Sequence, residues 1–180
     1  SEVHLLDGER ALSYSRDGTL RLWNLKDGSS QLLKRHTKPI NGVQLLDGER
    51  ALSYSYDRIR LWNLKDGSSQ VFKGHTNWIK GVQLLDSERA FSWSDDLTLR
   101  LWNLKDGSSK VFKGHTDAIL GVQLLDGERA FSMQDDSTLR LWNLKDGSSK
   151  VFKGHAEWIL GVQLLDSERA LSWSRDSTLR

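Results

Sequence analysis

One nine-residue segment, Leu-Trp-Asn-Leu-Lys-Asp-Gly-Ser-Ser, occurs four times and divides the chain into repeats. The copies begin at Leu22, Leu61, Leu101 and Leu141, at steps of 39, 40 and 40 residues. Residues 101–140 and 141–180 are identical at 32 of 40 positions. Such repetition is typical of one structural unit multiplied along a chain. The expected units cover residues 1–40, 41–79, 80–119 and 120–159, followed by a half repeat over 160–180.

The balanced composition limits the classes of protein to consider. The 180 residues are 37% hydrophobic and carry a net charge of +2, which gives no reason to expect a nucleic acid or a membrane as partner. The chain has no cysteine, which excludes disulfides and thiolate metal sites. No apolar run approaches the length of a membrane span. These features predict a soluble, cytoplasmic protein.

Each repeat contains four short segments typical of β-strands. In the third repeat they cover residues 82–85, 89–94, 98–102 and 110–113, and turns rich in Asp, Gly and Ser separate them. Asp-Gly favours a hairpin because Gly accepts a positive φ without steric cost. No stretch has the sustained 3.6-residue period of an amphipathic helix. A sheet this small cannot bury both its faces alone, so the copies must stack face to face.

The repeats resemble the blades of the WD40-repeat β-propeller family over essentially the whole chain. The Gly-His pair of that family is matched at residues 74–75, 114–115 and 154–155, and its Ser-x-Ser-x-Asp turn at residues 13–17 and in later copies. Its Trp-Asp is Trp-Asn here. The resemblance implies an all-β fold, a β-propeller of four-stranded antiparallel WD-type blades with about 4.5 blades per chain. It does not determine the function, because one fold serves many functions.

Two positions depart from the family pattern. Arg35 precedes His36 where the other copies have Gly, and the turn at residues 56–59 is one residue shorter than its equivalents. The shorter turn accounts for the 39-residue step and leaves its geometry open. The near-identity of the copies also fits recent amplification or deliberate construction.

The resemblance further implies a hydrogen-bonded set of four residues in each repeat, made of His, Asp, Ser and Trp. Such a set gives partners to polar groups that the blade would otherwise bury unpaired. The sets of His75 and His115 take their carboxylates from the turns at Asp96 and Asp136. By residue type, the expected network consists of His36, His75, His115, His155, Asp17, Asp57, Asp96, Asp136, Asp176, Ser53, Ser92, Ser132, Ser172, Trp23, Trp62, Trp102 and Trp142.

Nothing in the sequence predicts catalysis. The repeat histidines would lie in separate blades, which prevents them from converging on one metal ion. Asp95-Asp96 and Asp135-Asp136 are paired carboxylates, but adjacent residues on a tight turn usually point apart. The chain also has no glycine-rich phosphate loop and no nucleophile elbow. We expect no catalytic residue, no metal site and no cofactor, and the chain is not expected to be an enzyme.

The tryptophans fall into two classes. Four recur in every repeat and are expected to pack between blades. Trp78 and Trp158 are replaced by Ala118 in the copy between them. A buried ring does not readily exchange with alanine, because the truncation costs about 3–5 kcal/mol. We therefore expect Trp78 and Trp158 to be exposed at a rim.

Differences between copies concentrate in two windows. Six of the eight differences between residues 101–140 and 141–180 lie in windows equivalent to 114–120 and 133–138. In a blade these windows are the loop ahead of the first strand and the turn between the second and third strands, on one rim. Either this rim has been diversified for binding, or the turns of the opposite rim need their Asp-Gly geometry. The candidate binding residues are Arg16, Tyr56, Trp78, Asp95, Asp117, Asp135, Glu157, Trp158 and Arg175.

Two classes of function fit these patterns. The first is a non-enzymatic scaffold that self-assembles into a closed ring and offers the variable rim to a protein or peptide. Aromatic and Arg anchors favour such a partner, and a glycan stacked on the rim tryptophans is the lectin-like variant. The second is a purely structural or engineered self-assembling repeat protein with no ligand.

The strand count predicts how the ring closes. The chain holds five first strands, five second, four third and four fourth, so its N-terminus cannot complete the last blade in the manner usual for the family. An open end would leave an apolar blade face in water, which favours association. We expect a homodimer that closes a ring of eight to ten blades. The alternatives are a strained monomeric ring of four to five blades and a fragment of a larger ring.

Overall fold

The computed structural model describes residues 2–33, 36–56, 58–166 and 168–180. Within these ranges the chain forms eighteen β-strands, and it forms no helix that is long and apolar enough to cross a membrane. The strands lie in four four-stranded antiparallel sheets and one two-stranded sheet. The all-β fold of about four and a half blades that the sequence predicts is therefore confirmed. Arg35 and the Asp57 of the shortened turn lie outside the described residues.

Every sheet is a meander whose strands follow one another in sequence order. The first sheet contains β1 (Glu2–Leu5), β2 (Arg10–Tyr14), β3 (Leu20–Asn24) and β4 (Ser30–Leu33). The second contains β5 (Gly42–Leu45), β6 (Arg50–Tyr54), β7 (Arg58–Asn63) and β8 (Ser69–Lys73). The third contains β9 (Ile79–Leu84), β10 (Arg89–Ser94), β11 (Leu99–Asn103) and β12 (Ser109–Phe112). The fourth contains β13 (Ile119–Leu124), β14 (Arg129–Gln134), β15 (Leu139–Asn143) and β16 (Ser149–Phe152). A half blade follows, with β17 (Ile159–Leu164) and β18 (Ala170–Ser174).

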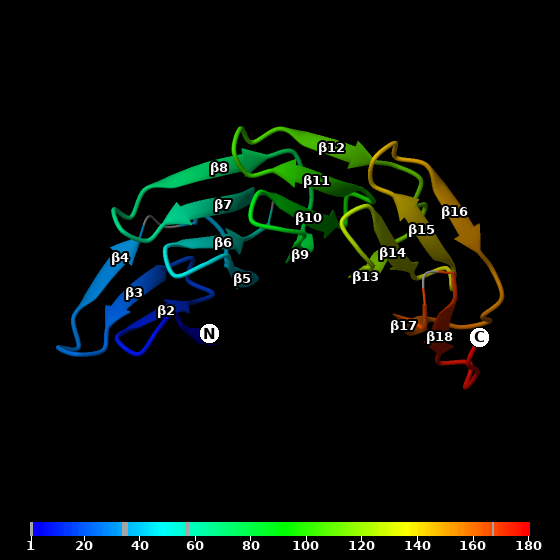
Figure 1. Ribbon diagram of the computed structural model, residues 1–180, viewed down its shortest axis with the longest axis horizontal. Coiled ribbons are helices and arrows are strands. Elements are labelled where there is room, and N and C mark those ends of the chain that lie inside the picture. The colour runs from blue at the N-terminus through cyan, green and yellow to red at the C-terminus, as the bar shows by residue number, and fades with distance from the viewer. Residues whose placement is uncertain (1, 34–35, 57, 167) are drawn as a thin grey trace.

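The sheets are arranged side by side in an open arc (Figure 1). The first strands β5, β9, β13 and β17 lie along its concave side, and the fourth strands β4, β8, β12 and β16 lie along its convex side. The two termini lie at opposite ends of the arc. We refer to the first and second strands of a blade as its inner pair, and to the third and fourth strands as its outer pair.

The hydrophobic core lies between neighbouring sheets rather than within any one of them. At the junction of the third and fourth sheets, Phe112 of β12 meets Trp142 of β15 edge-on, with ring centroids 5.8 Å apart. Phe72 and Trp102 repeat this contact one junction earlier, at 5.9 Å. Edge-to-face contact adds to the burial of both rings. At these two junctions, the third-strand Trp of one blade thus covers the fourth-strand Phe of the blade before it.

In three of the repeats, a glycine at Gly42, Gly81 or Gly161 lets an aromatic side chain lie directly on the first strand. A Cβ atom on Gly81 would lie 2.1 Å from Cζ2 of Trp93, and one on Gly161 would lie 2.1 Å from the same atom of Trp173. No side chain fits at that distance, so only glycine is compatible with the ring. The pairing of the strands shifts nearby, between Trp93 and Ser94 in the third sheet.

Candidate functional site

The two variable windows meet on one rim of the arc, as the sequence predicts. The backbone N–H of Asp95 donates to the carbonyl of Trp78 at 2.9 Å, and that of Arg175 donates to the carbonyl of Trp158 at 3.0 Å. The loop before each first strand is thereby fastened to the turn between the second and third strands. We call the surface formed by these loops and turns the variable rim.

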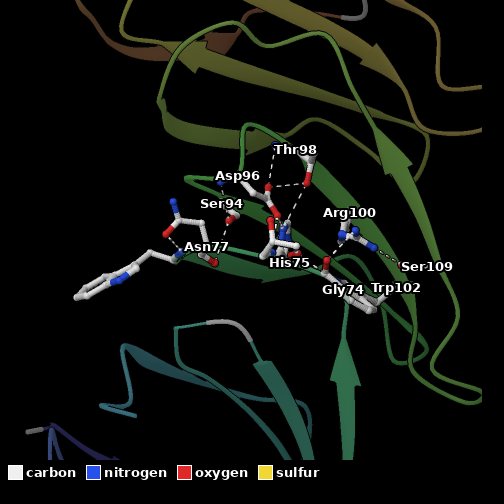
Figure 2. A network of polar contacts seen from close by, with 12 residues as sticks. Gly74, His75, Asn77, Ser94, Asp96, Thr98, Arg100, Trp102 and Ser109 are labelled. Carbon is white, nitrogen blue, oxygen red and sulfur yellow. Dashed lines mark hydrogen bonds and ion pairs between the residues drawn. The ribbon is translucent and has the colours of Figure 1, made fainter.

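Beneath this rim, the four residues expected around His75 form a chain of hydrogen bonds that runs from Asp96 through His75 and Ser92 to Trp102. His75, Asp96 and Trp102 are labelled in Figure 2. His75 Nδ1 is 2.8 Å from Oδ2 of Asp96, and its Nε2 is 2.8 Å from Oγ of Ser92. The indole N–H of Trp102 donates to the same Ser92 oxygen at 2.8 Å. The Asp96 carboxylate also accepts the backbone N–H of Thr76 at 3.0 Å. The set therefore ties the loop before β9 to β10, to β11 and to the turn between them.

The protonation of this set follows from its surroundings. Burial lowers the pKa of the His75 imidazole, although the Asp96 carboxylate opposes this effect. Burial alone would raise the pKa of Asp96, but hydrogen bonds from Thr98, His75 and Thr76 outweigh it and hold that pKa below its usual value. A neutral His75 beside an ionised Asp96 carries its proton on Nδ1. Ser92 then accepts from Trp102 and donates to Nε2 of His75.

The set around His115 has a different composition from the expected one. His115 Nε2 lies 2.8 Å from Oγ of Ser132, and the Trp142 indole N–H donates to that oxygen at 2.8 Å. At Nδ1 the neighbour is Gln134, at 3.0 Å, while the Asp136 carboxylate accepts hydrogen bonds from Thr138. The expected hydrogen bond from His115 to Asp136 is therefore replaced by one between His115 and Gln134. Gln134 reaches His115 because its longer side chain stands where Ser94 stands in the preceding repeat.

The direction of the Gln134 amide fixes the proton on His115. The backbone N–H groups of Thr116 and Asp117 each lie 3.0 Å from one end of the amide, and that end must be the oxygen because it accepts from both. The other end, Nε2, then donates to Nδ1 of His115. The His115 proton is left on Nε2, facing Ser132. His75 and His115 thus hold opposite tautomers in repeats that are nearly identical in sequence.

The remaining sets are partial within the described residues. His36 lies 2.6 Å from Ser53, which accepts the Trp62 indole N–H at 2.7 Å, and the Asp57 expected there lies outside the described residues. His155 lies 2.9 Å from Ser172 and 3.0 Å from Asp176, but the sequence has no repeat Trp after this set.

The first repeat shows the complementary case. The indole N–H of Trp23 donates to Ser13 at 2.8 Å, and Asp17 accepts the backbone N–H and the hydroxyl of Thr19. No Gly-His precedes this Ser in the sequence. The two ends of the chain therefore each hold part of one set.

Exposed aromatic side chains mark the variable rim. Trp78 is 47% exposed and Trp158 is 41% exposed, which confirms the exposure predicted from the exchange with Ala118. The Arg175 guanidinium lies 4.6 Å from the centre of the Trp158 ring, a cation–π distance. Tyr56 meets Trp78 edge-on at 5.8 Å. The rim thus presents two braced aromatic surfaces, one on the second and third sheets and one on the half blade.

The other candidate rim residues are distributed along the arc. Asp95 forms an ion pair with Lys80 at 3.1 Å, while its neighbour Asp96 faces His75, so these adjacent carboxylates have separate partners. Asp117 accepts the backbone N–H of Ala118 at 2.7 Å. Arg16 and Glu157 are exposed, and Asp135 is partly buried. Among the described residues, no three His, Asp or Glu side chains are grouped so as to hold a metal ion.

The ends of the arc form a second candidate surface that the repeat comparison alone does not locate. At the N-terminal end, Leu25 is 49% exposed, whereas its equivalents Leu64, Leu104 and Leu144 are buried. At the C-terminal end, Phe152 is 39% exposed, whereas Phe112 is buried. We call these surfaces the N-terminal face and the C-terminal face.

The C-terminal face is hollowed. A cleft of about 600 Å³ lies between the fourth sheet and the half blade, with mainly apolar walls that include Phe131, Leu141, Phe152 and Leu164. Outer strands fill the equivalent space at the internal junctions. The cleft therefore has the shape and chemistry of a junction without its second half.

Comparisons with known proteins support the fold. No family model matches the chain, and no curated protein matches it significantly. The crystal structure of the computationally designed Ika8 protein is similar to it, with a TM-score of 0.78 and 22% sequence identity over 99% of this chain and 57% of that chain. This chain therefore spans little more than half of the Ika8 chain. A likeness at this identity concerns the fold, and none of the comparisons indicates an enzyme family.

Proposed function

We propose that the chain is a non-enzymatic, WD-type repeat scaffold that assembles with a second copy of itself into a closed propeller ring. The observation that carries the proposal is the complementarity of its two end faces. Each internal junction pairs a fourth-strand apolar residue with the Trp and Leu of the next outer pair. The C-terminal face exposes Phe152, and the N-terminal face exposes Leu25 beside a partly exposed Trp23. The C-terminal face thus carries one half of an internal junction, and the N-terminal face carries the other half.

The comparison structure supports the same proposal. The Ika8 chain is similar over 99% of this chain, and this chain accounts for 57% of it. About two of these chains are needed to reach the length of the Ika8 chain. Head-to-tail contacts between two copies give twofold symmetry when the rotation closes. Closure would remove the apolar end faces from water, which supplies the driving force.

The first experiment is an absolute mass by light scattering on a size-exclusion column, across a dilution series. We expect twice the 20.5 kDa of one chain, unchanged on dilution. The variant Leu25→Asp should return the mass to one chain while the spectrum of the folded sheets is kept, because Leu25 is already exposed in a single copy. Leu120→Asp is the matched control, since Leu120 is also exposed but lies on β13, away from both end faces. A monomer at all concentrations would overturn the proposal.

A second function is favoured by the exposed rim aromatics. We propose that the variable rim of the assembled ring binds a protein or peptide through Trp78 and Trp158, with Arg175 and Tyr56 bracing the rings. Rigid aromatic anchors with few rotatable bonds are common at such interfaces. A phage-displayed peptide library should yield binders that Trp78→Ala/Trp158→Ala no longer retains. A glycan array run with the same pair of proteins tests the lectin-like alternative, and no differential binder in either screen would favour a scaffold without ligand.

A further inference from the structure

We infer that the ring closes by strand exchange, so that β17–β18 of one copy and β3–β4 of the second copy form one composite blade. The β1–β2 pair of the second copy is then released from its own sheet. This inference rests on the proposed two-copy ring and specifies the partner surface on each side of its junctions.

The strand count leads to this arrangement. Within the described residues, each chain forms five inner pairs and four outer pairs. Two copies therefore bring ten inner pairs and eight outer pairs, which complete at most eight four-stranded blades. One inner pair per copy is surplus, and it must be either β1–β2 or β17–β18. Two copies would also exceed the length of the Ika8 chain, since each spans 57% of it.

The apolar side chains favour β17–β18 as the pair that stays. An isoleucine stands just before the Gly-Val of every later first strand, and it is buried at each of them, at Ile40, Ile79, Ile119 and Ile159. The first strand β1 places Glu2 where the other repeats have glycine. Its Val3 and Leu5 are exposed. Release of β1 therefore forfeits little buried apolar surface. Release of β2 uncovers Ala11, Leu12 and Tyr14, and the equivalent residues of β18, Ala170, Leu171 and Trp173, would take their places beside β3.

The polar sets lead to the same conclusion. His155, Ser172 and Asp176 are already joined at the C-terminal end, and no Trp of the described residues donates to Ser172. Trp23 at the other end donates to Ser13, and no Gly-His precedes that serine. In the composite blade, Trp23 of one copy would stand beside Ser172 of the other, as Trp102 stands beside Ser92. One exchange completes a four-residue set that neither end completes alone.

The free edge of β18 has room for the incoming strand. Arg180 exchanges backbone hydrogen bonds with Ser172 at 3.0 and 2.8 Å, and Leu179 forms a bridge to Trp173. The chain thus occupies only the start of the third-strand position. The positions beside Ala170 and Leu171 lie next to the apolar cleft of about 600 Å³. The incoming β3 would fill this cleft from Leu22 onward. Its Leu20 and Arg21 would replace Leu179 and Arg180 beside Trp173 and Ser172.

The internal register fixes which residues would meet. In the third sheet, Arg89 pairs with Asn103 at the end of β10 and β11. By the repeat, Arg169 of one copy would pair with Asn24 of the other in the composite blade. In an unexchanged first sheet, Asn24 instead pairs with Arg10 of its own chain. The two arrangements therefore give Asn24 different neighbours in different chains.

Engineered disulfides test this choice, because the chain has no cysteine of its own. Paired strand positions lie within the Cα separation that a disulfide spans. Oxidised Asn24→Cys/Arg169→Cys should form a covalent dimer on a non-reducing gel, at twice the 20.5 kDa of one chain. Asn24→Cys/Arg10→Cys should keep free, alkylatable thiols in the dimer. Asn103→Cys/Arg89→Cys is the control, and it should form its disulfide within one chain.

Hydrogen exchange on the unmodified dimer gives a second readout that needs no variant. We expect the amides of β1 and β2 to exchange fast, and those of β17 and β18 to be as protected as those of β13 and β14. A dimer in which Asn24→Cys bonds to Arg10→Cys and β1–β2 are protected would overturn the inference while keeping the two-copy ring. A monomer in light scattering would overturn both proposals.

Discussion

The turns on the two rims of the arc differ in how much their sequences vary from repeat to repeat. On the rim opposite the variable rim, which we call the constant rim, every turn after a first strand has the pattern Leu-Asp-x-Glu-Arg. Asp86 accepts the backbone N–H groups of Glu88 and Arg89 at 2.9 and 2.8 Å, and it holds the Arg89 guanidinium at 2.7 Å. Arg89 also donates to the Gly127 carbonyl of the next blade at 3.2 Å. A change in this turn would affect two blades at once.

On the variable rim, the loops and turns are held by bonds from the backbone and from buried side chains. The exposed side chains that differ between repeats lie around these bonds. The loop and turn are held by backbone bonds, such as that from Asp95 to Trp78, and by the carboxylate of Asp96. Trp78 and Arg175 point into solvent and can change without loss of those bonds. The comparison teaches that the constancy of one rim has a structural cause. The case for binding therefore rests on the exposed aromatic rings and not on the contrast between rims.

The largest effect on the free energy of unfolding is expected at Asp96, whose carboxylate holds the loop and turn of the variable rim together. Asp96→Ala should lower the free energy of unfolding by about 2–3 kcal/mol, because it leaves the imidazole of His75 and the N–H of Thr76 without a charged acceptor. Asp136→Ala, at the equivalent position, should cost about 1 kcal/mol, since Gln134 already serves His115. Urea unfolding of the two variants measures the difference, and equal losses would contradict the assignment of Gln134.

The second effect is a loss of stability on acidification, which comes from protonation of His75 and His115. Burial lowers the pKa of both His75 and His115, so the unfolded chain binds their protons first as the pH falls through about 6.5. The stability that the neutral histidines supply is full above that pH. It should be lost on acidification, at a rate of at most about 1.4 kcal/mol per pH unit for each histidine. Unfolding curves between pH 7 and 5.5 measure this slope, above the range where carboxylates titrate in the unfolded chain.

Nuclear magnetic resonance of the ring nitrogens sharpens the same prediction. We expect the Nδ1–H tautomer at His75 and the Nε2–H tautomer at His115, because their Nδ1 neighbours are a carboxylate and an amide donor. The same tautomer at both residues, or titration of either ring at or above pH 6.5 in the folded protein, would show that the anchors of the two repeats do not differ as described.

Much of the blade and of the difference between its two rims can be predicted from the sequence. The repeat length, the turn chemistry and the strand segments predict a blade, and the replacement of Trp78 by Ala118 predicts exposure. The sequence also predicts that the two variable windows share a rim, because alternate turns of a meander lie on the same side. These inferences succeed because they depend on local periodicity and on exchange between copies.

Other features need the three-dimensional structure. Gln134 differs from Ser94 in the sequence, but only the structure shows that its amide displaces Asp136 from His115. The requirement for Gly81 is equally invisible, because the ring of Trp93 that covers it comes from the next strand. The exposure of Leu25 and Phe152 at opposite ends depends on which strands lack a neighbouring blade. Each of these depends on tertiary packing, which a pattern along one chain does not report.

A third, smaller effect is expected on the constant rim. Asp86→Ala should cost about 1 kcal/mol, because its hydrogen bonds are exposed and partly replaced by water. Asp166→Ala is the matched variant, because it removes the same turn bonds in the last copy. Both changes are made in the monomeric Leu25→Asp background, where no described blade follows Arg169. A smaller loss for Asp166→Ala would assign part of the Asp86 effect to the bond from Arg89 to Gly127. Equal losses would confine the role of this turn to its own blade.

The smallest effect on stability is expected on the variable rim itself. Trp78→Ala and Trp158→Ala should each change the free energy of unfolding by less than about 0.5 kcal/mol, because both rings are largely in solvent. Ala118→Trp, the reverse exchange in the intervening copy, should be similarly neutral. Thermal unfolding of the three variants measures this, with the size-exclusion mass as a check that assembly is unchanged. A loss above about 1.5 kcal/mol would mean that these rings pack in the assembled ring, and it would move them from a binding surface to a structural junction.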